Sequence, residues 1–153
     1  MTRNEYTNKL GQFWSNFNSL EMSLRLYLTK KNQESEVGLE LDVGSSCPLS
    51  HMTNYDTFEA LAAKYNHAVS EKHRINVSDV VRLRDAIAHG RAVMKEDVPL
   101  TLVKFSRPDR CDNTVKVTFK EVLTTDFLDR CINQTYATIL SVAKRVEDEF
   151  PGA

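Results

Sequence analysis

Residues 78–91, with the sequence SDVVRLRDAIAHGR, decide how the rest of the chain is interpreted. Apolar residues recur here at steps of three and four, which predicts an amphipathic helix. Asn76 or Ser78 can cap its first turn, and Gly90 can end or loosen it. The apolar residues of this helix are Val77, Val80, Val81, Leu83 and Ile87.

Two arginines fall on the apolar side of this predicted helix. On a wheel of about 100° per residue with Val80 at zero, Arg84 lies at about 40° and Arg91 at about 20°. A guanidinium keeps its charge, and burying it without a partner costs several kcal/mol, so it needs a carboxylate, a phosphate or a wet cleft. A purely structural salt bridge, for example to Glu21, is the alternative interpretation.

An acidic residue and a histidine share the opposite side of the helix. Asp85 and His89 are four residues apart and therefore neighbours, so the carboxylate can orient the imidazole and favour its protonated form. A surface pair without function is the alternative. Arg84 and His89 point about 140° apart on an ideal helix, so a second subunit, a bend near Gly90 or the reach of the arginine must bring them together.

The chain N-terminal to this helix predicts two more helices. A long amphipathic helix covers residues 10–28, and residues 29–55 then lose all periodicity, as a lid or a mobile connection would. Asp56 followed by Glu59 resembles a capping box, which predicts that the next helix starts near Thr57.

The C-terminal part predicts a hairpin and a last helix. Residues 100–105 and 115–119 are rich in strand formers and are separated by turn-forming residues, while residues 124–126 open a helix that continues to Pro151. The expected fold is mainly α: one domain spanning residues 1–153, a bundle of four to five helices with a small β-hairpin before the last helix.

Composition excludes several classes of protein. The chain has 153 residues, 41% of them hydrophobic, which is enough to bury a core without disulfides. Its three cysteines are far apart and contain no C-x-x-C pair, which argues against a disulfide framework and a zinc ribbon. The sequence contains no signal peptide pattern and no membrane span, so we expect a cytoplasmic protein. The cysteines are Cys47, Cys111 and Cys131.

No metal site or cofactor is expected either. The remaining histidines lack ligand spacing such as H-E-x-x-H, and the chain has no glycine-rich phosphate loop. Residues 71–95 contain six Lys or Arg and three acids, a local charge of +3 against −1 for the whole chain. A phosphate backbone would be attracted to such a surface, although a solvated helix face can give the same count.

A resemblance to a known family rests on residues 84–90, Arg84-Asp85-Ala86-Ile87-Ala88-His89-Gly90. This string resembles the arginine, polar residue, short spacer and histidine motif of the HEPN superfamily, in which a glycine commonly follows the histidine. The long first helix and the long last helix after the motif are also similar to that family, but only the motif is specific.

The resemblance implies a homodimeric helical bundle in which two motif helices share a cleft, and a metal-independent endoribonuclease that cleaves RNA through attack by the 2′-OH. His89 would move protons, Arg84 would stabilise the phosphorane, and Asp85 would hold His89 or the partner subunit. Arg82 and Arg91 would grip flanking phosphates. Such a protein would be a toxin or an antiphage defence effector with RNA as substrate and an antitoxin as partner.

Two other functions stay open at this point. The same helix could serve a non-catalytic HEPN-like module that dimerises or binds a nucleotide or a protein. The chain could also be a helical scaffold with no role in nucleic-acid chemistry.

Overall fold

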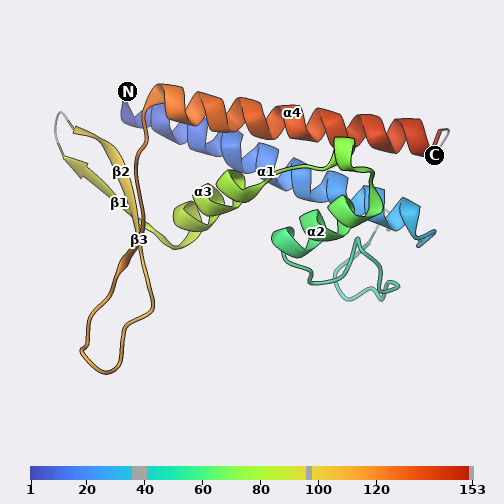
Figure 1. Ribbon diagram of the computed structural model, residues 1–153, viewed down its shortest axis with the longest axis horizontal. Helices are drawn as coiled ribbons and strands as arrows, with labels where there is room; N and C mark the ends of the chain where they lie inside the picture. Colours follow the sequence, from blue (N-terminus) through green and yellow to red (C-terminus); the bar gives the residue numbers. More distant parts are fainter. Residues whose placement is uncertain (36–40, 96–97, 152–153) are drawn as a thin grey trace. The chain divides into compact units, whose positions relative to one another are not determined.

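The computed structural model describes residues 1–35, 41–95 and 98–151. The described chain is mainly helical and contains a small three-stranded antiparallel sheet, as Figure 1 shows. The elements, in chain order, are α1 (Arg3–Lys31), α2 (Phe58–Ala68), the 3₁₀ turn η1 (Glu71–His73), α3 (Ser78–His89), β1 (Arg91–Lys95), β2 (Val98–Phe105), β3 (Val117–Val122) and α4 (Thr125–Glu149). The mainly α fold class is therefore confirmed.

Contacts within the chain define two compact units. The sheet unit comprises Met1–Ser15 and Ser78–Gln134, and the loop unit comprises Asn16–Val77 and Thr135–Ala153. Helices α1 and α4 are each divided between the two units, α1 after Ser15 and α4 after Gln134. The candidate residues of the motif all belong to the sheet unit.

The core of the sheet unit forms where α1, α3 and α4 bury their apolar residues. Phe13, Leu83 and Leu128 are almost completely buried, in agreement with the helical spacing of the sequence. The backbone N–H of Leu100 donates to the hydroxyl of Tyr6, with 3.0 Å between nitrogen and oxygen, so β2 is tied to the first turns of α1.

The sheet has the order β1-β2-β3 and presents two unlike faces. Leu100 and Leu102 of β2 are buried, whereas Val103 pairs with Arg91 on one side and Lys120 on the other. Since side chains alternate along a strand, Arg91, Val103 and Lys120 share the outer face. The hairpin of β2 and β3 confirms the expected one, but β1 was not predicted.

One expectation about the motif helix is wrong. α3 ends at His89 and the chain enters β1 at Arg91, so Arg91 is not part of an apolar helix face. The wheel assumed a helix that continues past Gly90. Pairing with β2 takes over at that point, because a strand hydrogen-bonded to a neighbour satisfies the backbone groups that a further helical turn would have used.

One smaller expectation also needs correction. The side-chain cap of α2 is Thr57, whose hydroxyl accepts from the backbone N–H of Ala60, and not Asp56. Asp56 accepts hydrogen bonds from Asn54 and Lys64 instead.

Helix α1 also orders the end of the long connection in the loop unit. The guanidinium of Arg25 donates to the backbone oxygens of His51, Asn54 and Asp56, and it pairs with Glu21. The part of segment 29–55 next to α2 is therefore held in place, whereas residues 36–40 lie outside the described chain.

The far end of the loop unit is held by a second polar cluster around Glu149. Burial raises the pKa of this carboxyl, but hydrogen bonds from Arg145, Tyr27 and Lys31 outweigh it and leave the pKa below its ordinary value. The cluster stabilises the fold above the ordinary pKa of a glutamate, and this contribution is lost as the pH falls through the lowered pKa.

Replacing Tyr6 with phenylalanine tests the link between α1 and β2. We expect Tyr6→Phe to lower the free energy of unfolding by about 1–3 kcal/mol, because the backbone N–H of Leu100 is then buried without a partner. Urea unfolding measures the change. Tyr136→Phe is the matched control, since Tyr136 is exposed, and it should unfold like the wild type. Equal stability of both variants would contradict the assignment.

Candidate functional site

His89 occupies the last position of α3 and is open to solvent. Its side chain is 63% exposed, and its Nε2 lies 3.8 Å from Oδ1 of Asp85 one turn earlier. The prediction that Asp85 and His89 are neighbours on the helix is therefore confirmed. The imidazole has one face beside a carboxylate while the rest remains accessible to a ligand.

Asp85 has a second partner, which sequence reasoning missed. The ammonium of Lys104 on β2 forms a salt bridge and hydrogen bond with the other carboxylate oxygen of Asp85. The cation lowers the negative charge felt at His89 and holds the carboxylate in one orientation. Lys104 follows Leu100 and Leu102 at period two, so a charged residue on the buried face of a predicted strand was the signal that could have found it.

Arg84 lies on another side of α3, half-buried against α1. Its guanidinium carbon is 5.9 Å from the centre of the Trp14 ring, a cation–π contact within the sheet unit. Trp14 is 38% exposed, so it covers Arg84 rather than filling the core as its neighbour Phe13 does. Glu21, the alternative partner considered from the sequence, pairs with Arg25.

The two arginines expected to bind RNA also lie over aromatic rings. Arg82 of α3 is 5.8 Å from the ring centre of Phe119 on β3, and Arg91 at the start of β1 is 5.8 Å from the ring centre of Phe105 on β2. Both arginines are exposed. Their guanidinium groups are therefore fixed at the surface by stacking, which leaves polar edges facing solvent.

Within this single chain the structure brings together only part of the predicted site. His89, Asp85 and Lys104 form one group, and Arg84 with Trp14 forms another. Because Arg84 and His89 are five positions apart on a regular helix, the two side chains leave α3 in directions about 140° apart. The helix does not bend to close this angle, since it ends at His89.

Gly90 positions the group around His89. Its backbone N–H donates to the carbonyl oxygen of Ala86 at 2.6 Å, and the chain then turns directly into β1. A Cβ atom at this position would collide with the Ala86 carbonyl oxygen and lie 3.0 Å from that of Val103. Glycine is required here because two backbones approach each other closely, and not because of a positive φ angle.

Neither a metal site nor a membrane segment is found in the described residues. No group of three or more His, Cys, Asp or Glu side chains is placed to hold a metal ion in residues 1–35, 41–95 and 98–151. No helix in the same part of the chain combines the length and apolar character needed to cross a bilayer.

Comparison with known proteins found no match to a family model, to a curated protein or to a solved structure. The HEPN resemblance therefore depends on the motif at residues 84–90 and on its helical context alone.

Adding one methyl group at Gly90 tests the close approach. We expect Gly90→Ala to destabilise the fold by about 1–3 kcal/mol, since the added Cβ meets backbone that must shift. Gly11→Ala is the control with the opposite sign: Gly11 lies inside α1 with open space around it, so alanine should stabilise by about 0.5–1 kcal/mol. Thermal and urea unfolding measure both. A Gly90→Ala protein as stable as the wild type would contradict the interpretation.

Proposed function

We propose that the chain is a HEPN-like helical protein that cleaves RNA without a metal, as a homodimer. The observation that carries this proposal is the exposed His89 beside Asp85 at the end of α3, in a motif that also contains Arg84. RNA supplies its own nucleophile in the 2′-OH, so the protein must provide a group that moves protons and a cation that stabilises the phosphorane.

The proposed roles follow from the surroundings of each residue. His89 takes the proton of the 2′-OH as the oxygen attacks phosphorus, and the departing 5′ oxygen takes a proton from water. The products are a 2′,3′-cyclic phosphate and a 5′-hydroxyl. Asp85, held by Lys104, orients the imidazole.

A second subunit can bring an arginine and a histidine of the motif together, which one chain alone does not do. Because Arg84 and His89 leave α3 on different sides, Arg84 of one copy would meet His89 of the other across a two-fold interface. Trp14 holds the guanidinium in place by stacking. The conformational entropy that Arg84 loses on binding a phosphate is therefore smaller. A toxin or antiphage defence effector, kept inactive by an antitoxin, is the cellular role that fits such a chemistry.

RNA cleavage tests the proposal directly. Labelled RNA incubated with the protein in EDTA should yield 2′,3′-cyclic phosphate ends, and a strand with 2′-deoxy sugars should stay intact. We expect His89→Ala to lower the rate by about 10²–10⁴-fold, the usual contribution of a general acid or base. His67→Ala is the matched control, because His67 is also exposed in the last turn of a helix. Unchanged cleavage by His89→Ala, or no cleavage by the wild type, would refute the proposal.

Mixing two inactive variants tests the shared cleft. If Arg84 and His89 meet across the interface, a heterodimer of Arg84→Ala and His89→Ala chains holds one intact site and one doubly altered site. A mixture should then regain roughly a quarter of wild-type activity, since half of the dimers are mixed and one of their two sites works. A mixture as inactive as either variant alone would show that the residues act within one chain or not at all.

A non-catalytic HEPN-like module is the second candidate. The stacking of Arg84 on Trp14 and the pairing of Asp85 with Lys104 favour it, because both interactions also make sense as purely structural ones. This reading predicts a stable dimer that binds RNA or a nucleotide equally well with and without His89, and that cleaves neither.

A further inference from the structure

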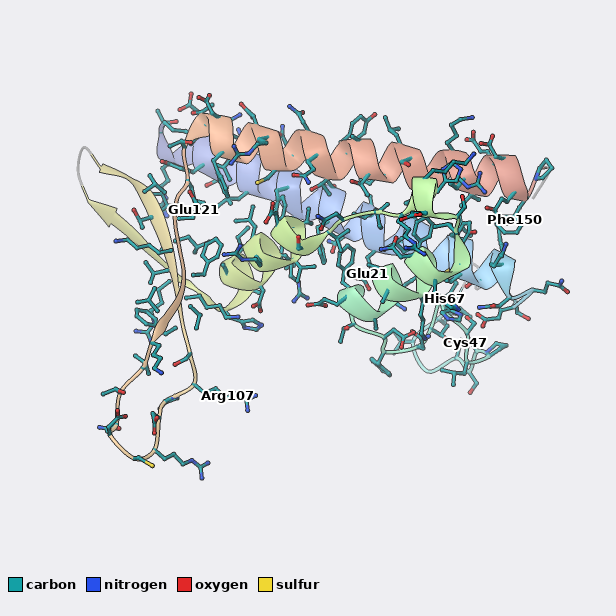
Figure 2. The ribbon with its side chains drawn as sticks, in the orientation of Figure 1. Glu21, Cys47, His67, Arg107, Glu121 and Phe150 are labelled. Atoms are coloured by element: carbon teal, nitrogen blue, oxygen red, sulfur yellow. The ribbon has the colours of Figure 1, made fainter. Side chains whose placement is uncertain are left out.

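A pocket of about 220 Å³ opens in the sheet unit between α3, β3 and α4. Its floor is apolar, with Leu83 and Cys131 buried beneath it. Glu121, which lies toward the end of β3 that leads into α4, is labelled in Figure 2. The charged and aromatic side chains that line the pocket are Asp79, Arg82, Phe119, Glu121, Phe127 and Arg130.

Both arginines of this pocket lie on phenylalanine rings. Arg82 covers Phe119, and the guanidinium carbon of Arg130 lies 5.5 Å from the ring centre of Phe127. In the described part of the chain neither arginine forms a salt bridge within 4.0 Å. Two flat cationic groups are thus fixed by stacking, and their N–H groups are left to water or to a ligand.

Two carboxylates complete the polar lining. Asp79 and Glu121 likewise form no salt bridge among the described residues, although both line the same pocket as the arginines. The charges converge on Cys131: burial raises the pKa of its thiol, Arg130 opposes the rise, and Asp79 and Glu121 add to it. Four charged side chains, those of Asp79, Arg82, Glu121 and Arg130, therefore line one small pocket without forming ion pairs with one another.

The mixed charge decides what kind of ligand fits. A lone phosphate would meet two carboxylates, and a lone divalent cation would meet two guanidinium groups, so neither is favoured. A neutral planar ring with hydrogen-bond donors on one edge and acceptors on another satisfies both signs at once. The volume of about 220 Å³ exceeds that of a cavity of about 150 Å³ that binds a benzene ring, so a bicyclic ring is of suitable size.

We propose that this pocket binds a guanine base. Guanine presents two adjacent donors, N1–H and the N2 amino group, that one carboxylate can accept together, and its O6 and N7 accept from an arginine. Glu121 or Asp79 takes the donor edge, and Arg82 or Arg130 takes the acceptor edge. Adenine, which has no such pair of donors and has an amino group in place of O6, leaves a carboxylate and a guanidinium unpaired.

The base can belong to the RNA of the proposed nuclease, and this extension depends on that proposal. Arg82 and His89 lie seven residues apart on α3, which places them about 20° apart on the wheel and about 10 Å apart along the axis. A guanine in the pocket and a phosphate beside His89 then belong to one short stretch of strand. Arg82 would recognise a base rather than grip a phosphate.

The test measures binding in a His89→Ala background, where RNA is not cut. Calorimetry with GMP, AMP, CMP and UMP should show GMP binding at least about tenfold more tightly than the others, as expected for one bidentate pair. Glu121→Gln and Arg82→Ala should each weaken GMP binding by about tenfold or more. Glu147→Gln and Arg107→Ala, which alter exposed residues outside the pocket, should leave it unchanged; Arg107 is labelled in Figure 2.

A second arm identifies the source of the base. A short ribo-oligonucleotide with a single guanine that binds more tightly than GMP indicates an RNA strand, and equal affinity indicates a free nucleotide. Equal or absent binding of all four nucleotides, or GMP binding that ignores Glu121→Gln and Arg82→Ala, would overturn the pocket. GMP binding by a protein that never cleaves RNA would refute the nuclease alone, whereas cleavage without any guanine preference would refute the pocket alone.

Discussion

The close approach of two backbones at Gly90 is the constraint on which the candidate site depends. With no side chain at this position, the chain leaves α3 beside the carbonyl oxygens of Ala86 and Val103 and enters β1 at once. This short connection leaves His89 at an open helix end. It also sets β2 beside α3, so that Lys104 reaches Asp85. A larger residue at position 90 would push α3 away from the sheet and so move Asp85 away from Lys104.

Arginines that rest on aromatic rings are the second recurring feature of the sheet unit. The same contact occurs at four places in the described part of this unit: Arg84 on Trp14, Arg82 on Phe119, Arg91 on Phe105 and Arg130 on Phe127. A ring face attracts the cation without using its N–H groups, so this contact holds the guanidinium and consumes none of its hydrogen-bond donors. That property is what both proposals use: a cation for a phosphorane at Arg84 and a base-reading edge at Arg82. An ion pair in each place would have satisfied the charge and occupied that edge.

The sequence predicted local structure well and long-range partners poorly. Helical periodicity identified α3 and the i,i+4 neighbourhood of Asp85 and His89, because both follow from the pitch of a helix. It missed β1, since the five residues RAVMK show neither turn signals nor a clear alternation and become a strand only by pairing with β2. The same omission placed Arg91 on a helix face, although it lies on the outer face of the sheet.

The sequence by itself determined that Arg84 and His89 share one helix, that they diverge around it, and that a carboxylate accompanies the histidine. Each of these depends only on residue spacing and regular backbone geometry. Tertiary structure alone decided that Lys104 completes the Asp85 pair, that Trp14 covers Arg84, and that Arg82 borders a pocket with residues of β3 and α4. Those partners come from strand register and from packing between elements distant in sequence, and no local pattern encodes either.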